Sequence, residues 1–504
     1  MTTAPPLDDE TLRSKATGCW LGKAVGGTLG QPYEGVTHAL GLRYYDPVPA
    51  EMIPNDDLDL QVVAAALLDR MERPRVGREM LIPLWTDHVH MSPDEYGLCK
   101  RNLALGLRPP HTGSWDNWFA HGMGAAIRTE LWACLAAGDP GLAADYAYED
   151  ACLDHAGEGI EAARFFAALE ALAFVESDRD ALLDAASALL PASSKVRLAV
   201  ADTRRWHAER PDWRDVRRRI LSRWGHENCT DVVQNVAFTV LGWLAGGGDF
   251  GESLCIAVNC GQDTDCTGAT LGALLGILDP GGIPAKWLEP IGRDLVLSPS
   301  IELPGHPPTL DAFTDLVLDL RRRIGGAPPA SPPRAEPPRL AVPAEIGFLP
   351  VIRSRNQASE PALGAAVPLP RLGEMHSVEL PGTVARWPAD RFEGGTMAVR
   401  YRFDFDDETA TKVLFNTPES VRVYIDGKLA FEREGGRMCP AMHRAPANQM
   451  ARRRFGPGTH EVVALIDRPP EPREIVWAFG LGEDTGENVC DRWLTTIYHA
   501  APPS

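Results

Sequence analysis

Two short acidic clusters contain the residue types that could do chemistry in this chain. The first is the pair Asp263 and Asp265, which is followed by an uncharged run in which Gly268, Gly272 and Gly276 recur every four residues. This spacing predicts a helix with one flat glycine stripe, which another helix can approach closely. Asp263 can cap the start of that helix, where unpaired N–H groups and the positive end of the helix dipole lie. A cap needs one aspartate, and it leaves the second unexplained.

The second cluster is Asn55-Asp56-Asp57, which precedes a long apolar stretch. Pro54 disfavours helix at the residue before it, so the pattern predicts a helix that begins at or just after Asn55. Both aspartates then lie in its first turn. Interaction with the helix dipole could account for them, at about 0.3–1 kcal/mol per charge. With Asp59 close behind, the segment has more aspartates than a cap requires.

The two clusters together suggest a metal centre. Two carboxylates about 4 Å apart repel by about 4 kcal/mol at an effective dielectric constant near 20, so converging aspartates need protons or cations. Oxygen ligands without a nearby His or Cys pair favour hard cations such as Mg²⁺, with Mn²⁺ possible. Four aspartates balance two divalent ions, which predicts a binuclear site with ions about 3.5–4 Å apart. That the clusters meet is a hypothesis at this point. The four residues are Asp56, Asp57, Asp263 and Asp265.

The composition is typical of a globular protein long enough for two or three domains. Of the 504 residues, 44% are apolar and 24% are charged. The net charge of −19 argues against a nucleic-acid partner, which requires a concentrated basic surface. We expect no signal peptide, transmembrane helix or membrane partner, because no suitable apolar run is present. The ten cysteines form no CxxC pair, which predicts reduced thiols and a cytoplasmic location.

The periodicity of apolar residues predicts two domains. Helical spacing dominates residues 1–324, for example at 8–30, 142–174, 233–244 and 310–324, and predicts an all-α domain. Residues 325–339 are rich in Pro, Ala and Gly, which is typical of an extended linker. A period of two then predicts strands at 397–405, 461–467 and 475–481, and a hairpin at 421–431 with a type I′ turn. Residues 340–504 are therefore predicted to form an accessory β-sandwich.

Other glycine-rich segments could approach a ligand. Residues 26–35 have the composition of a flexible loop, and this loop presents the carboxylate of Glu34. Gly122 and Gly124 free the backbone on either side of Met123, and their N–H groups could hold phosphate. His155 lies within the helical pattern of 142–174, where a single histidine is more often structural than functional.

In this order, the segments resemble the ADP-ribosylglycohydrolase family, of the dinitrogenase reductase-activating glycohydrolase type, over about residues 10–300. The matching segments are the first helix with the loop of Glu34, Asn55-Asp56-Asp57 (Ser/Thr-Asp-Asp in the family), Gly122–Arg128 (Gly-Asn-Gly-x-x-Met-Arg), Asp154-His155 (Thr-His) and Gly261–Cys266 (Gly-x-Asp-Thr-Asp-Thr).

The resemblance implies an all-α fold with two Mg²⁺ ions in a central cleft, and hydrolysis at the anomeric carbon of ADP-ribose or a related ribosyl group. Glu34 would be a carboxylate on a mobile loop near the metals. The residues carried over by position fall into three groups: Asn55, Asp56, Asp57, Asp263 and Asp265 for metal; Glu34, Asp57 and Asp263 for catalysis; and Gly122, Met123, Gly124 and His155 for the diphosphate and ribose of the substrate.

Four residues depart from the family pattern. Asn55 replaces a hydroxyl residue, and its amide oxygen is a weaker metal ligand than a carboxylate. Leu58 stands where many members have Thr, and Met123 replaces an Asn. Cys266 replaces a Thr. A thiol is a poor Mg²⁺ ligand, so we expect Cys266 to contribute packing rather than coordination.

The leading hypothesis is therefore a Mg²⁺-dependent hydrolase that removes an ADP-ribosyl or related ribosyl group, with Glu34 or Asp57 assisting as positive charge develops on the sugar. One alternative is a non-catalytic nucleotide or sugar binder, which the changes at Asn55 and Cys266 favour. A two-metal phosphohydrolase is another. The β domain lies outside the resemblance. It looks faintly like jelly-roll or PA14-like sandwiches, and we expect it to bind carbohydrate or a protein.

Overall fold

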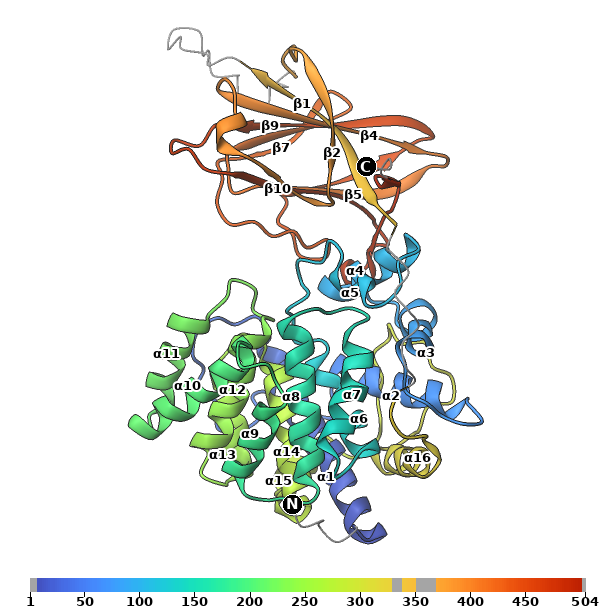
Figure 1. The fold of residues 1–504 in the computed structure, drawn as a ribbon, viewed down its shortest axis with the longest axis vertical. Coiled ribbons are helices and arrows are strands. Elements are labelled where there is room, and N and C mark those ends of the chain that lie inside the picture. Colours follow the sequence, from blue (N-terminus) through green and yellow to red (C-terminus); the bar gives the residue numbers. More distant parts are fainter. Residues whose placement is uncertain (1–6, 329–337, 350–368, 501–504) are drawn as a thin grey trace. The chain divides into compact units, whose positions relative to one another are not determined.

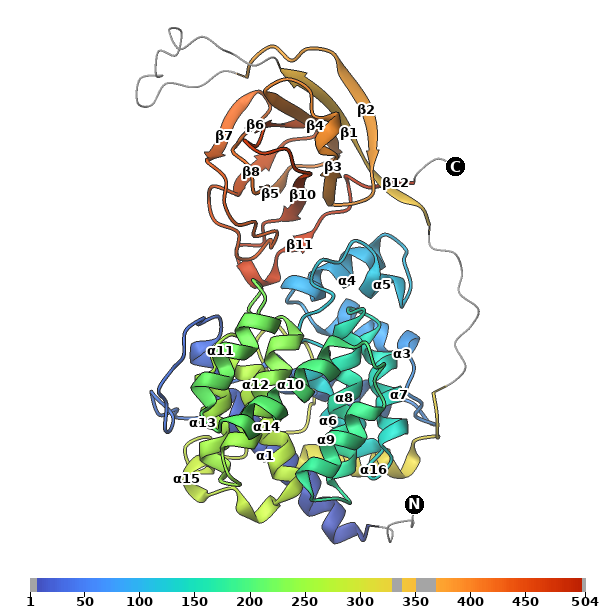
Figure 2. The ribbon, with the colours of Figure 1, turned by 60° about the vertical axis from the view of Figure 1, so that its left-hand side comes forward.

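The computed structural model describes residues 7–328, 338–349 and 369–500, which form two compact units. The first unit contains the described residues up to His90 and from Pro109 to 328, and it is helical (Figures 1 and 2). The second contains Met91–Arg108 and the described residues from 338 onward, and most of it is β structure. The predicted order of an all-α domain before a β domain is confirmed.

The helical unit is built around α1 and α14. Its helices are α1 (Asp9–Gly30), α2 (Asp56–Asp69), α3 (Arg78–Pro83), α5 (His111–Ser114), α6 (Glu130–Leu135), α7 (Pro140–Ala151), α8 (Glu158–Ala173), α9 (Arg179–Ala188), α10 (Lys195–Glu209), α11 (Trp213–Trp224), α12 (Val232–Ala245), α13 (Phe250–Asn259), α14 (Thr264–Leu278), α15 (Ala285–Leu288) and α16 (Leu310–Arg323), with short turns η1 (Gln31–Tyr33), η2 (Leu84–His88), η3 (Ala126–Arg128) and η4 (Pro280–Gly282). Among the described residues, no helix is long and apolar enough to cross a membrane.

Helices α1 and α14 pack backbone against backbone. A Cβ atom added to Gly22 would lie 1.9 Å from the carbonyl oxygen of Gly272, and one added to Gly26 would lie 2.0 Å from that of Gly268. The close approach predicted from the glycine stripe of α14 is confirmed, and α1 supplies a matching stripe. The helix predicted over 8–30 is confirmed, because α1 ends at Gly30, and the overlapping prediction of a flexible loop is wrong for residues 26–30, which are buried helix. Their glycines permit this contact rather than a turn.

The helical pattern at 142–174 is divided between two helices. Helix α7 ends at Ala151 and α8 begins at Glu158, and the connection contains Gly157, whose φ of +53° favours glycine. His155 therefore lies in a connecting loop and not inside a helix. The periodicity continues through the break because residues on both sides face the same core.

The second unit contains two antiparallel sheets. Their strands are β1 (Leu340–Leu349), β2 (Met375–Leu380), β3 (Val384–Trp387), β4 (Thr396–Phe405), β5 (Thr409–Asn416), β6 (Val421–Ile425), β7 (Lys428–Arg433), β8 (Met450–Phe455), β9 (Gly458–Asp467), β10 (Ile475–Glu483), β11 (Arg492–Trp493) and β12 (His499–Ala500). One sheet has the order β12-β1-β4-β9-β6-β7 with β2 also on β1, and the other has β11-β10-β5-β8 with β3 also on β10.

The two sheets form separate layers, as Figure 1 shows, and aromatic side chains pack between them. Tyr401 of β4 stacks on Phe479 of β10, with ring centroids 3.9 Å apart, and Trp477 of β10 donates a hydrogen bond to the Tyr401 hydroxyl. The predicted hairpin is confirmed: β6 pairs with β7, and Asp426 and Gly427 both have positive φ, as a type I′ turn requires.

The unit boundary differs from the prediction at one place. Residues 91–108, which include α4 (Asp94–Ala104), belong to the β unit and not to the helical unit. Arg101 of α4 is buried and donates hydrogen bonds to Thr383 Oγ1 (3.1 Å) and to the Tyr498 hydroxyl (2.9 Å). Helical periodicity shows that a face is buried, but it does not show against which unit. Most of the predicted linker at 325–339 lies outside the described residues.

Candidate functional site

The N-termini of α2 and α14 meet, and this brings the two acidic clusters together. Asn55 is the N-cap of α2, and its side-chain oxygen accepts a hydrogen bond of 2.7 Å from the N–H of Asp57. Its amide nitrogen donates a hydrogen bond of 3.1 Å to Oδ2 of Asp265 in the first turn of α14. One side chain therefore caps the first helix and joins it to the second.

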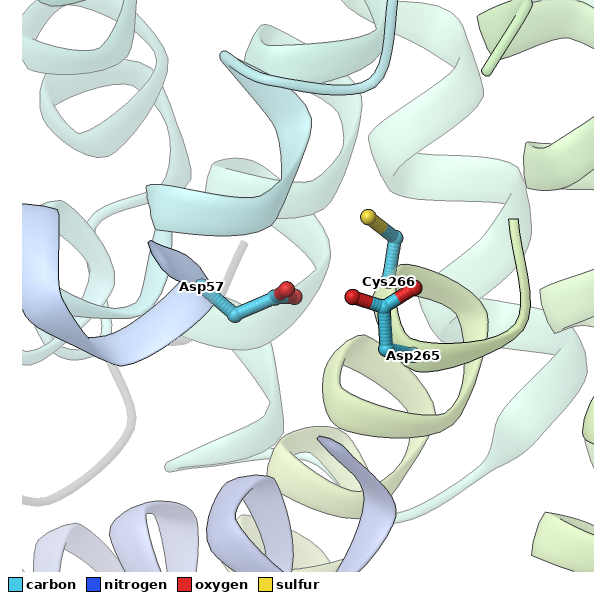
Figure 3. A group of neighbouring side chains, drawn as sticks. All are labelled: Asp57, Asp265 and Cys266. Carbon is cyan, nitrogen blue, oxygen red and sulfur yellow. The ribbon is translucent and has the colours of Figure 1, made fainter. Parts of the chain in front are cut away.

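Two groups of side chains at this junction have the separations of metal ligands. Asp57, Asp265 and Cys266 form one group (Figure 3), and Glu34, Asp263 and Asp265 form the other. Within each group, one atom of each residue lies within 4.8 Å of the others. Two oxygens bound to one Mg²⁺ at about 2.0–2.1 Å are at most about 4.2 Å apart, so side-chain shifts of less than an ångström would bring the ligand atoms of either group onto one divalent ion. Asp265 belongs to both, as a carboxylate shared by two ions would.

Several oxygens of the buried aspartates at this junction lack a hydrogen-bond donor among the described residues. Asp57 and Asp263 are each 1% exposed, and Asp265 is 4% exposed. Both oxygens of Asp57, Oδ2 of Asp263 and Oδ1 of Asp265 accept no hydrogen bond from the described residues. A buried acceptor without a hydrogen bond lowers the stability of the fold by about 1–3 kcal/mol, and a charged acceptor lowers it by more. Cations would satisfy all of these oxygens, so the residues present fit a two-ion centre.

Asp263 does not cap its helix. It occupies the N-cap position of α14, but no N–H of the described helix donates to its side chain. The N-cap aspartates of α12 and α13 do accept such bonds. The residue before it, Gln262, has a φ of +72°, which is strained for a residue other than glycine. The capping prediction is therefore wrong, and the carboxylate belongs instead to the group with Glu34 and Asp265.

Glu34 lies on a loop that is tied to the start of α14. The N–H of Gly35 donates to the carbonyl of Gln262 (2.8 Å), and the N–H of Gln262 donates to the carbonyl of Val36 (2.7 Å). Glu34 is exposed, whereas the aspartates beside it are buried. The resemblance implied a mobile loop, but these two bonds hold Glu34 next to Asp263 in this structure.

The electrostatics of the junction favour protons or cations. Burial raises the pKa of Asp57 well above its ordinary value; Lys23 opposes this, and the charges of Asp265 and Asp56 add to it. Burial and the charges of Asp265 and Glu34 likewise raise the pKa of Asp263. Asp56 itself is half-buried in the first turn of α2.

Lys23 is a buried residue of the site that the sequence analysis missed. Its Nζ donates to Glu130 Oε1 (2.8 Å) and to the Ile127 carbonyl (2.7 Å), and it lies 3.7 Å from Oδ1 of Asp57. Gln61 of α2 donates to the other oxygen of Glu130 (2.7 Å). Lys23 is the one charged residue in the otherwise small and apolar stretch 16–30 of α1, in a chain whose basic residues are mostly arginine, and this is the signal that could have revealed it.

Of the predicted phosphate-binding residues, Gly122 and Met123 are already engaged in local structure. The Gly122 N–H donates to the Phe119 carbonyl (2.9 Å), and the Met123 carbonyl accepts from two N–H groups of the following turn. The Met123 side chain is 1% exposed. The Gly124 carbonyl accepts a hydrogen bond of 2.6 Å from Arg128. Their contact with a substrate stays a prediction.

His155 is part of a buried polar network. Its Nδ1 lies 2.8 Å from Oδ1 of Asp154, which also accepts a hydrogen bond of 2.8 Å from Arg128. Burial opposes the charge of Asp154, but Arg128 and His155 outweigh it and lower its pKa to about 2. The segment at 111–119 packs closely here, since a Cβ on Gly113 would lie 2.4 Å from the carbonyl oxygen of His155. Whether His155 contacts a substrate stays a prediction.

The comparisons with known proteins identify the family. A family model described as ADP-ribosylglycohydrolase matches residues 8–322. Among solved structures, an ADP-ribosylglycohydrolase-related protein complex is similar at 20% identity and a TM-score of 0.43, over 62% of this chain and 99% of that one. The β-glucosidase of Kluyveromyces marxianus in complex with glucose is similar at 12% identity and a TM-score of 0.18, over 31% and 16% of the two chains.

The epithelial adhesin 9 A domain of Candida glabrata is similar at 11% identity and a TM-score of 0.15, over 34% of this chain and 93% of that domain. Likenesses at these TM-scores carry no argument about function. No curated protein matches the chain. The family match covers more than half of the chain and contains both acidic clusters, α1 and the Asp154-His155 pair. The chain therefore belongs to the ADP-ribosylglycohydrolase family.

Proposed function

We propose that the helical unit hydrolyses the bond at the anomeric carbon of an ADP-ribosyl or related ribosyl group, with two divalent cations held at the N-termini of α2 and α14. The observation that supports this most is the set of unsatisfied buried oxygens on Asp57, Asp263 and Asp265, in a chain of the ADP-ribosylglycohydrolase family. Bound Mg²⁺ or Mn²⁺ would neutralise these carboxylates, orient ribose hydroxyls and make water a stronger nucleophile.

The carboxylates of the site have different roles in the proposed reaction. Glu34 is the exposed carboxylate of the site and is our candidate general base, which would accept a proton from the attacking water. Asp57 is buried against Lys23, which suits a ligand better than a base. The negative charge of these groups would stabilise the positive charge that develops on the sugar ring during bond cleavage.

On the substrate side, we propose that the Gly122–Gly124 turn and His155 lie along the diphosphate and ribose. The Arg128 side chain fixes both parts, since it donates to the Gly124 carbonyl and to Asp154, which in turn contacts His155. Arg128 therefore sets the distance between the Gly122–Gly124 turn and His155. A carbohydrate or protein partner for the β unit stays a prediction.

The proposal is tested by calorimetric titration of Mg²⁺ and ADP-ribose into the protein, together with turnover of ADP-ribosyl-arginine, ADP-ribosyl-serine and free nucleosides. We expect cation binding, and release of a ribosyl product that stops when the cations are chelated. Asp263→Asn should abolish turnover while the fold is retained. Asp249→Asn, which changes a helix cap of α13 away from the site, should behave like the parent.

The outcomes separate the alternatives. Binding of Mg²⁺ and ADP-ribose without turnover of any substrate would favour a non-catalytic nucleotide or sugar binder. Release of phosphate instead of a ribosyl product would favour a two-metal phosphohydrolase. Full activity of Asp263→Asn would rule out the site that we assign.

A further inference from the structure

Cys266 faces the proposed metal centre and not an apolar core. Its Sγ lies within 4.8 Å of an oxygen of Asp57 and of an oxygen of Asp265, and the residue is 7% exposed. Figure 3 shows the carboxylates of Asp57 and Asp265 facing each other from α2 and α14, with the sulfur of Cys266 beside the space between them. The expectation that Cys266 only packs does not explain this position.

The surroundings of this thiol differ from those of a structural buried cysteine. A buried cysteine usually behaves as a small apolar side chain. Cys266 instead has carboxylates beside it, and both oxygens of Asp57 and one of Asp265 lack a hydrogen-bond partner within the described ranges. These buried, unpartnered acceptors point to a ligand in the same space, and the sulfur borders that space.

We propose that the position formed by Asp57, Asp265 and Cys266 binds a thiophilic divalent cation, of the Zn²⁺, Co²⁺ or Cd²⁺ class, through the Cys266 sulfur. The position formed by Asp263 and Asp265, beside Glu34, has oxygen ligands and binds Mg²⁺ or Mn²⁺. This inference rests on the proposed two-cation centre. It implies that the two positions hold different metals, and not two Mg²⁺ ions.

Ligand chemistry separates the two positions. Thiolate is a soft ligand that favours zinc-like ions, whereas carboxylate sets suit Mg²⁺ and Mn²⁺. A catalytic zinc site usually has three protein ligands and an open fourth position, with bonds of about 2.3 Å to sulfur and about 2.0–2.2 Å to oxygen. Two carboxylates and one thiol supply this number. On binding, the S–H bond breaks, the sulfur–metal bond forms, and the proton leaves to the solvent.

The test is a titration of the metal-free protein with Co²⁺, followed by near-ultraviolet absorption, in which a cobalt–thiolate bond gives a charge-transfer band. We expect the band to saturate at one equivalent and to survive about a hundredfold excess of Mg²⁺. Cys266→Thr, which restores an oxygen side chain, should lose the band. Cys266→Ser is the second variant if the threonine disturbs folding.

Cys229→Ser is the matched control, because Cys229 is a partly exposed thiol that is not one of the three residues of the proposed thiophilic position. The band should persist in this variant. The proposal is overturned if Co²⁺ binds to the parent protein without the band. It is equally overturned if the band remains in both Cys266 variants, or disappears in Cys229→Ser.

Metal content distinguishes this inference from the proposed function. After dialysis against Mg²⁺ alone, Cys266→Thr should hold two Mg²⁺ per chain, and the parent protein one. If the parent protein holds two Mg²⁺, hydrolyses a ribosyl substrate and shows no cobalt band, then the thiophilic position is wrong and the proposed function stands. If the parent protein binds no divalent cation of either class, both fail.

Discussion

Asn55 and Asp265 are 210 residues apart in the sequence and are joined by a hydrogen bond of 3.1 Å. The same Asn55 side chain accepts from the Asp57 N–H and so caps α2. The amide group therefore fixes the separation between two helix N-termini, and each of these carries candidate metal ligands. Asn55 stands where the family has a hydroxyl residue, and here its first role is to position the carboxylates.

Asn55→Ala should weaken both the fold and cation binding. Loss of an N-cap lowers the free energy of unfolding by about 0.5–2 kcal/mol, and Asp265 also loses its hydrogen-bond donor, so we expect a total of about 1–3 kcal/mol. Denaturant unfolding with and without Mg²⁺ measures this. Asp178→Ala removes only the cap of exposed helix α9 and should leave the Mg²⁺-induced stabilisation intact. Equal behaviour of the two variants would contradict the positioning role of Asn55.

Gly22→Ala should disrupt the contact between α1 and α14. The new Cβ would lie 1.9 Å from the Gly272 carbonyl oxygen, so the two backbones must separate. Overpacking of a core typically lowers the free energy of unfolding by about 1–3 kcal/mol, and we expect the upper end or more because backbone atoms collide. The control is Gly41→Ala, where no described heavy atom lies within 4 Å of the added Cβ. Equal melting temperatures of Gly22→Ala and Gly41→Ala would contradict the backbone contact between α1 and α14.

Lys23→Met should destabilise the helical unit strongly. It removes the ammonium group that pairs with the buried carboxylates of Glu130 and Asp57. Breaking a buried ion pair by removing one partner typically lowers the free energy of unfolding by about 3–5 kcal/mol. In the double variant Lys23→Met/Glu130→Gln, the main uncompensated charge is also removed, and most of the loss should be recovered. A double-mutant cycle from denaturant unfolding measures this coupling. Additive effects of the two substitutions would show that the pair is not coupled.

The Asp154 carboxylate should stabilise the fold in a pH-dependent way. Its pKa is lowered to about 2, against about 3.8 when unfolded. Its stabilisation, about 2 kcal/mol, is therefore fully present above pH 4 and is lost as the pH falls towards 2. Asp154→Asn lacks this contribution, so the difference in free energy of unfolding between parent and variant should shrink from pH 5 to pH 2. A difference that is constant over this range would contradict the lowered pKa.

Much of the site's framework can be predicted from the sequence, because local rules decide it. Residue spacing predicted where α2 begins, and the glycine stripe predicted the close contact of α14. The period of two and the Asp426-Gly427 turn predicted the hairpin of the β unit. The start of α2 and the hairpin turn depend on neighbours in the chain, and the close approach at α14 depends on the missing side chains of its glycines; the sequence displays both directly.

The features that the sequence analysis missed depend on distant partners. The role of Lys23 follows from Glu130 and Asp57, which come from other helices. The placement of α4 with the β unit follows from contacts with Thr383 and Tyr498. Residues 26–30 have the glycine content of a loop as well as a place in the helix predicted over 8–30, and the glycines of α14 opposite them favour the helix. Asp263 satisfies every local rule for a cap, yet the strained turn at Gln262 precedes it and its carboxylate joins Glu34 and Asp265 instead.

The central claim is that the buried carboxylates at the two helix N-termini hold two divalent cations. Counting the metal ions per chain after equilibrium dialysis against Mg²⁺ and Co²⁺ together, in the parent protein and in Asp265→Asn, tests it most directly, because Asp265 belongs to both groups of ligands. We predict two divalent cations in the parent protein and at most one in the variant. A parent protein that binds none, or a variant that still binds two with unchanged affinity, would contradict the claim.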